Sequence, residues 1–164
     1  MKKLALLFSV AMVLLLGVLA VVSPVGASTK FKADLKGENE VPANASLATG
    51  SIEFELSEDG SVINYTFEVS DITDFTQSHI HYAPVGVNGP IVVWLVPSMP
   101  PLTSIRGDLE FELEGTITAS DFVGPLAGMT LGDLISLFES GNAYVNVHTK
   151  GIPGGEIRGQ VMAD

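Results

Sequence analysis

The chain has 164 residues, of which 46% are hydrophobic and many are glycine or proline, a composition typical of one globular domain rich in turns. A formal net charge of −11 argues against nucleic acid as a partner, because phosphate is bound by lysine and arginine. The absence of cysteine excludes disulfides, thiolate metal sites and cysteine nucleophiles, so stability must come from the apolar core.

Residues 1–27 are predicted to be a signal peptide. A basic start is followed by a long uncharged apolar run, and the small residues Val25-Gly26-Ala27 precede the expected cleavage site. The apolar run is about long enough to cross a bilayer, so a retained membrane anchor is the alternative. We expect export, cleavage after Ala27, and a domain of residues 28–164 at the cell exterior, without a membrane association after cleavage.

Alternating apolar and polar residues predict antiparallel strands through the first half of this domain. The predicted strands span residues 29–35, 49–56, 62–69 and 91–96, together with a short strand around the first two histidines. Asp59-Gly60 indicates a hairpin turn between the second and third strands. Residues 71–77 are expected to be a polar connection, residues 84–90 are expected to be a loop, and the prolines of residues 97–101 are expected to end the fourth of these strands.

In the second half, alternation predicts strands at residues 108–117, 143–149 and 156–161. Between the first two of these, the apolar spacing changes to that of a helix. Thr130 and Asp133 form a capping-box pattern, and Gly141 marks the end of a helix of about nine or ten residues. Short strands at regular spacing favour an all-β antiparallel sandwich or barrel with one short helix in a late loop.

The chemistry-bearing residues lie in two of the predicted strands. His79 and His81 share one strand face, and His148 follows in the strand at residues 143–149. Residues two apart on a strand have Cα atoms about 6.5–7 Å apart, so both imidazoles can reach one ion. If the two strands are neighbours, the three histidines can bind copper or zinc. The alternative is that the histidines hydrogen-bond to loop backbone and fix the loop at residues 84–90.

Other polar residues near these strands have a supporting role at most. Glu156 and Arg158 share a face of the last strand, where they form an ordinary charge pair that fixes the strand, an anion clamp, or contacts behind the metal ligands that orient a histidine. Asn146 shares a face with His148 and is expected to hydrogen-bond a loop; it is not expected to bind the ion itself. Asn88-Gly89 has the composition of a turn, and its backbone is placed to line the site.

Six motifs in order make the chain resemble the CHRD (chordin) domain. They are Glu38-Asn39-Glu40-Val41-Pro42, Ser78-His79-Ile80-His81, Gly86-Val87-Asn88-Gly89-Pro90, Gly124-Pro125-Leu126, Tyr144-Val145-Asn146-Val147-His148-Thr149 and Gly155-Glu156-Ile157-Arg158-Gly159-Gln160. The resemblance covers about residues 30–162, and the family includes single-domain secreted proteins of bacteria and archaea. Cysteine-rich modules of the chordin type are absent from the sequence, so growth-factor binding is not implied.

A second resemblance concerns the histidines. His79-Ile80-His81 and Val147-His148 are similar to copper-ligand motifs of Cu/Zn superoxide dismutases, which implies a Greek-key sandwich. The chain has no further histidine for a bridging position or a zinc subloop, so a dinuclear dismutase site cannot form from these residues. Fold similarity does not by itself establish activity.

Three functions follow as expectations. The first is a secreted protein that binds one copper or zinc ion through three histidines. The second is a non-enzymatic extracellular module with structural histidines and a protein or matrix partner. The third is a dismutase-like enzyme. The sequence assigns no catalytic residue, since no nucleophile motif such as Gly-x-Ser-x-Gly is present, and binding is favoured over catalysis.

Overall fold

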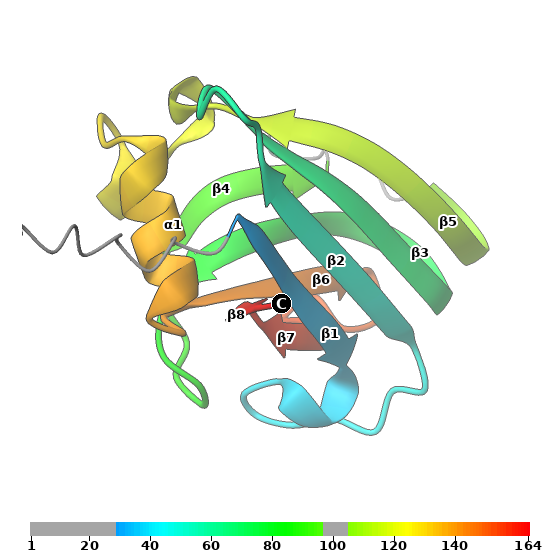
Figure 1. Ribbon diagram of the computed structural model, residues 1–164. Coiled ribbons are helices and arrows are strands. Elements are labelled where there is room, and N and C mark those ends of the chain that lie inside the picture. The colour runs from blue at the N-terminus through cyan, green and yellow to red at the C-terminus, as the bar shows by residue number, and fades with distance from the viewer. Residues whose placement is uncertain (1–28, 97–104) are drawn as a thin grey trace, which may run out of the picture.

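The computed structural model describes residues 29–96 and 105–164, in which eight strands form one antiparallel sheet that closes into a barrel (Figure 1). The strands are β1 Lys30–Lys36, β2 Thr49–Leu56, β3 Ile63–Tyr82, β4 Ile91–Val96, β5 Ile105–Ile117, β6 Ala143–Thr149, β7 Ile157–Gln160 and β8 Met162–Ala163. One α-helix, α1 (Leu131–Glu139), and three short 3-10 turns, η1 Gly37–Asn39, η2 Ala119–Asp121 and η3 Gly124–Leu126, complete the described elements. The expected all-β antiparallel fold with a short late helix is confirmed. The predicted signal peptide and the prolines of residues 97–101 lie outside the described residues.

Strand β3 closes the barrel because its two halves pair with different neighbours. Its first half pairs with β2, its second half pairs with β6, and the ring continues from β6 through β7 and β1 back to β2. Strands β5 and β4 pair with the free edges of the two halves. The end of β3 is thereby placed beside β6, although the two are far apart in the sequence.

The expected polar connection at residues 71–77 is wrong, because β3 runs through it without a break. Ile72 and Phe75 are buried in the core, and the strand bends at Asp71 and Asp74, where φ is 57° and 53°. Aspartate tolerates this left-handed conformation better than most residues. The polar composition of the segment therefore marks two irregular positions within a long strand.

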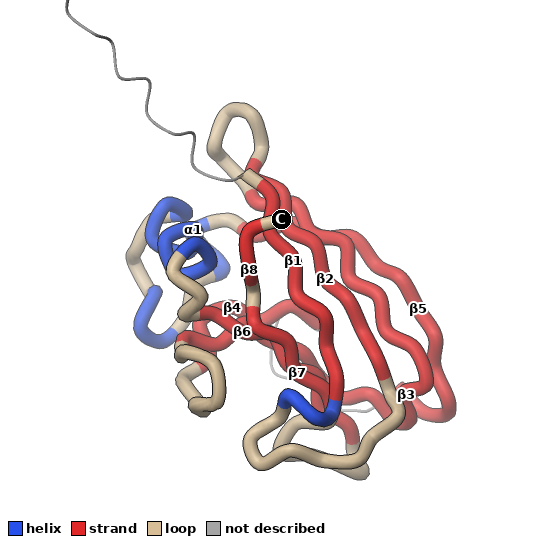
Figure 2. Tube along the Cα trace, turned by 60° about the horizontal axis from the view of Figure 1, so that its bottom comes forward, coloured by secondary structure: helices blue, strands red, loops and turns tan. Residues whose placement is uncertain are grey.

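Helix α1 lies across one end of the barrel, and η1 with the loop after it lies away from α1 (Figures 1 and 2). The helix begins after Thr130, whose backbone N–H donates to Asp133 Oδ2 at 2.8 Å, as the capping pattern predicts. Its buried Phe138 packs against Phe31 and Phe54, with ring centroids 5.2 and 4.9 Å apart. The helix thus closes the apolar core at this end.

Strand β6 is buried along its whole length, on both faces. Val145 and Val147 belong to the core, so the alternate residues Tyr144, Asn146 and His148 lie on the opposite face. That face is covered by the segments that follow β1, β3 and β6. Arg158 of β7 faces away from the core as predicted, but it is only 2% exposed, because strand alternation cannot reveal that loops cover the outer face.

We expect Phe138→Ala to lower the free energy of unfolding by about 3–5 kcal/mol, because it removes an aromatic ring from a packed core. Urea denaturation measures this loss. Ser136→Ala, on the exposed face of the same helix, is the control and should change stability by less than about 0.5 kcal/mol. A loss of less than about 1 kcal/mol for Phe138→Ala would contradict the packing described.

Candidate metal centre

The structure brings the three histidines together on the covered face of β3 and β6. In the register of these strands His79 lies opposite Asn146 and His81 lies opposite Tyr144, so His148 is one step along the same face. One nitrogen from each ring lies within 4.8 Å of the other two. All three histidines are at most 8% exposed. The proviso that the two strands be neighbours is therefore met.

Hydrogen bonds to two backbone carbonyls determine which ring nitrogen of His81 and of His148 carries the proton. His81 Nδ1 lies 2.8 Å from Gly89 O, and His148 Nδ1 lies 2.9 Å from Pro153 O. A carbonyl oxygen can only accept, so each Nδ1 is the N–H donor, and in the neutral ring Nε2 keeps a free lone pair. The same hydrogen bonds that fix the loops therefore leave one nitrogen of each ring available as a ligand.

Both interpretations of the histidines are realised in part. His81 Nδ1 bonds the loop at residues 84–90, as the structural interpretation expects, and His148 Nδ1 bonds the turn after β6. Nε2 of these two rings and Nδ1 of His79 face the cluster. His81 Nε2 lies 3.3 Å from His79 Nδ1, and His148 Nε2 lies 3.1 Å from Asn146 Oδ1. Within the described residues, His79 Nε2 is buried without a hydrogen-bond partner. The ring of His79 also meets Trp94 edge to face, with centroids 4.4 Å apart.

Burial keeps these imidazoles neutral. It lowers the pKa of His79 to about 3, helped by His148 and His81, and it lowers the pKa of His81 to about 4. Burial also lowers the pKa of His148, although its hydrogen bond to Pro153 acts in the opposite direction. At neutral pH no proton has to leave these nitrogens before an ion binds.

The geometry is close to what one ion requires. Two nitrogens bound to one zinc ion at about 2.1 Å in a tetrahedral site are about 3.4 Å apart. The His79–His81 separation of 3.3 Å matches this distance, and the widest separation in the cluster, up to 4.8 Å, needs a closure of about 1.4 Å. Three neutral imidazoles are a ligand set that suits copper and zinc. The three histidines could therefore hold a metal ion.

A stack of three planar groups supports His81. Its ring lies parallel to Tyr144, with centroids 4.7 Å apart, and the guanidinium of Arg158 covers the other side of Tyr144 at 3.4 Å. Arg158 also donates to Asn88 Oδ1 at 3.0 Å and to Val87 O at 2.9 Å. Gly89 N–H donates to the Tyr144 hydroxyl at 3.2 Å. The backbone of Asn88-Gly89 lines the site, as expected.

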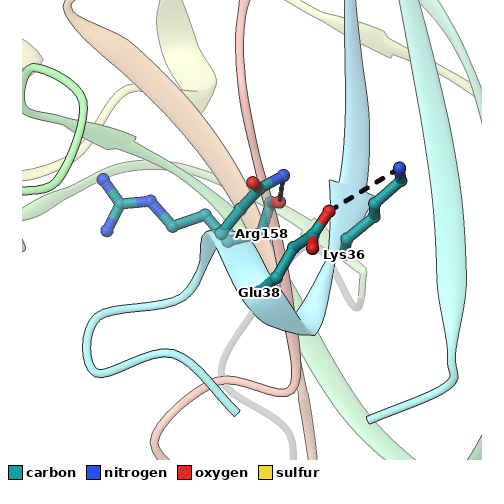
Figure 3. Close-up of polar contacts among 4 residues, drawn as sticks. Lys36, Glu38 and Arg158 are labelled. Atoms are coloured by element: carbon teal, nitrogen blue, oxygen red, sulfur yellow. Dashed lines mark hydrogen bonds and ion pairs between the residues drawn. The ribbon is translucent and has the colours of Figure 1, made fainter. Parts of the chain in front are cut away.

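Arg158 and Glu156 do not act as the pair that the sequence suggested. Glu156 bonds to Ser46 Oγ at 2.8 Å and to Thr149, so it fixes the loop after β1 and the turn after β6. Figure 3 shows the Arg158 side chain running away from the Lys36–Glu38 ion pair, whose Nζ–Oε1 distance is 3.7 Å. Of these two candidates, only Arg158 touches the group that stacks on a histidine.

Asn146 and Glu40 lie closer to the three histidines than the sequence suggested. The side chain of Asn146 contacts His79 and His148, and it also interacts with Glu40 in the loop after η1. Glu40, which follows η1, is only 6% exposed and interacts with the side chain of Asn146. A glutamate in a short loop is normally solvated, so only its family motif distinguished this position.

The depressed histidine pKa values predict that the metal-free protein loses stability in acid. Because each folded-state pKa lies below the ordinary 6.5, the unfolded chain takes up protons first as pH falls. The contribution is intact above about pH 6.5 and is lost as pH falls to about 4 for His81 and to about 3 for His79, with a slope of up to about 1.4 kcal/mol per pH unit for each histidine.

Urea denaturation with a chelator, repeated across this pH range, measures the slope. His79→Gln should flatten it, since the carboxylates that also titrate are common to both proteins. Equal slopes for His79→Gln and the unaltered protein would contradict the burial of a neutral His79.

Comparison with known proteins agrees with the motifs and the fold. Residues 31–161, most of the chain, match the family described as CHRD domain. A search of the curated proteins found no match. The chain therefore belongs to the CHRD domain family.

Proposed function

We propose that this protein is a secreted CHRD-domain protein that holds one transition-metal ion, copper ahead of zinc, through His79, His81 and His148. The observation that carries the proposal is the convergence of three imidazole nitrogens, two of which have lone pairs that carbonyl partners leave free. A set of rings that served only to fix loops would need their Nδ1 bonds but would have no reason to point the other nitrogens at one another.

The location of the protein forms part of the same proposal. CHRD domains are typically extracellular, and residues 1–27 have the composition of an export signal that is removed after Ala27. Among the described residues no helix has the length and apolar character needed to cross a membrane. A domain without cysteine gains no disulfide on export, and a bound ion would link β3 to β6 in place of one.

Copper is placed first because nitrogen ligands bind Cu²⁺ more tightly than Zn²⁺ in the usual order of divalent metals. Zinc remains the second choice, since it accepts three imidazoles in a tetrahedral site. Histidines that are at most 8% exposed leave little room for a substrate beside the ion. Burial therefore favours holding or delivering the ion over a dismutase-like reaction.

Titration with Cu²⁺ and with Zn²⁺ against a chromophoric chelator tests the proposal. We expect one ion per chain for the unaltered protein, and an affinity loss for His148→Gln greater than the 10–100-fold typical of contacts behind the ligands. Glu112→Gln, an exposed carboxylate on β5, is the control for adventitious binding to the acidic surface and should leave the affinity unchanged.

Cu²⁺ binding should also give an electron paramagnetic resonance spectrum with nitrogen couplings. Binding of several ions that Glu112→Gln weakens and His148→Gln does not would overturn the proposal. Stoichiometric binding to an extracellular protein or matrix component that a chelator leaves unchanged, with no metal bound, would favour the interaction module with structural histidines.

A bound ion should stabilise the fold by mass action. At a free concentration about 100 times Kd, the free energy of unfolding should rise by about 2.7 kcal/mol. Thermal or urea unfolding with and without the ion measures the change. His81→Gln should abolish the gain while remaining folded without metal, and a gain of the same size in His81→Gln would contradict a site built on this ring.

A further inference from the structure

A buried amide lies among the three histidines. Asn146 is only 4% exposed, and its Oδ1 lies 3.4 Å from His79 Nδ1 and 3.1 Å from His148 Nε2. On β6 it is paired with His79 of β3 on one side and with Arg158 of β7 on the other. The amide therefore reaches the point where the imidazole nitrogens meet.

The protons available at this point are too few for the acceptors. His148 has its proton on Nδ1, bonded to Pro153 O, so in the neutral ring Nε2 is an acceptor that faces another acceptor, Asn146 Oδ1. His81 Nε2 is an acceptor for the same reason and faces His79 Nδ1. His79 carries one ring proton. On Nδ1 it would satisfy only one of these acceptors, whereas on Nε2 it leaves Nδ1 as a further lone pair at the same point. With that proton on Nε2, the lone pairs that converge here are what a cation requires.

A reversed amide would relieve the conflict at His148, because Asn146 Nδ2 would then donate to Nε2. In that orientation Oδ1 would be turned toward Glu40, whose carboxylate offers further acceptor oxygens. The side chain of Asn146 interacts with Glu40 and lowers the pKa of this carboxyl, against the larger, opposing effect of burial. The carboxylate therefore requires the NH₂ group on its own side and keeps the amide oxygen on the side of the histidines.

Glu40 is itself held in place by its surroundings. It is only 6% exposed, and a Cβ at Gly155 would lie 2.5 Å from Glu40 Oε1, so the turn before β7 presses directly on the carboxylate. Gly155 has φ +127°, which other residues rarely adopt. Within the described residues Glu40 Oε1 is buried without a hydrogen-bond partner, and the charge of Arg158 favours its ionised form. The carboxylate can partly offset a positive charge placed beside Asn146.

We propose that Asn146 Oδ1 is a fourth ligand of the ion, and that Glu40 is the positioning residue that aims this oxygen at it. The inference rests on the proposed metal function and extends it. Three nitrogens and one amide oxygen are four ligands, enough to close a tetrahedral zinc site or a tetragonal Cu²⁺ plane without an open catalytic position. The oxygen ligand favours Zn²⁺ or Cu²⁺ over Cu⁺, which prefers soft ligands.

The first experiment measures the Zn²⁺ and Cu²⁺ affinities of the unaltered protein and of Asn146→Ala, with Asn64→Ala on an exposed position of β3 as the control. We expect an affinity loss of about 10–100-fold or more for Asn146→Ala and none for Asn64→Ala. With Cu²⁺ bound, electron–nuclear double resonance in H₂O and D₂O should find no strongly coupled water proton in the unaltered protein. Asn146→Ala, in which water replaces the amide oxygen, should show one.

The second experiment separates positioning from packing and does not depend on the folding of Asn146→Ala. Glu40→Gln keeps an acceptor for the Asn146 amide, whereas Glu40→Leu of similar size removes it. We expect Glu40→Leu to lose about 10–100-fold in affinity and Glu40→Gln to lose less. Circular dichroism and urea denaturation confirm that each variant is folded.

The outcomes distinguish this inference from the function on which it rests. If the unaltered protein binds no stoichiometric metal, the proposed function fails and this ligand set fails with it. If the unaltered protein and its His148→Gln variant behave as proposed but Asn146→Ala binds normally, with an unchanged spectrum, only the fourth ligand is refuted. Equal losses for Glu40→Gln and Glu40→Leu would refute the positioning role.

Discussion

Two hydrogen bonds from imidazole to backbone carbonyl fix the orientation of His81 and His148. His81 donates from Nδ1 to Gly89 O and His148 donates from Nδ1 to Pro153 O. These hydrogen bonds to the two loops fix each ring as the Nδ1–H tautomer. A ring held in this way keeps its Nε2 lone pair and loses most of its rotational freedom. The loops beyond β3 and β6 therefore orient both rings without the help of an ion.

The barrel supplies the rest of the arrangement. Because β3 takes part in both halves of the ring, its end carries His79 and His81 to the side of β6, while Ile80 and Val145 secure the same strands from the core. Tyr144 and Arg158 extend the support outward from His81, and Asn88 connects Arg158 to the loop after β1 by donating to Val41 O at 2.7 Å. The covered outer face thus brings together the end of β3, the strands β6 and β7, and the loop after β1, which are distant in the sequence.

Much of this architecture could be predicted from the sequence, because alternation and turn residues are local signals. The strands at residues 49–56, 91–96 and 143–149 agree with β2, β4 and β6, and the capped helix agrees with α1. The pattern also showed that His79 and His81 share a face. Their proximity to His148 depends on strand pairing, and the residues alone could state that only as a condition.

What could not be predicted depends on long-range packing. The polar residues 71–77 look like a connection, yet pairing with neighbours on both edges keeps β3 intact there. Alternation places Arg158 on the outer face but cannot show that loops bury it. The burial of Glu40 depends on Gly155, more than a hundred residues later, and no local pattern carries that information.

¹⁵N spectra of the imidazole rings report whether the loops leave the Nε2 lone pairs of His81 and His148 free for one ion. Without metal, both rings should be the Nδ1–H tautomer. Addition of one equivalent of Zn²⁺ should shift both Nε2 resonances and leave both Nδ1 protons in place. Protonated Nε2 atoms in the metal-free protein, or spectra that stoichiometric Zn²⁺ does not change, would contradict the account.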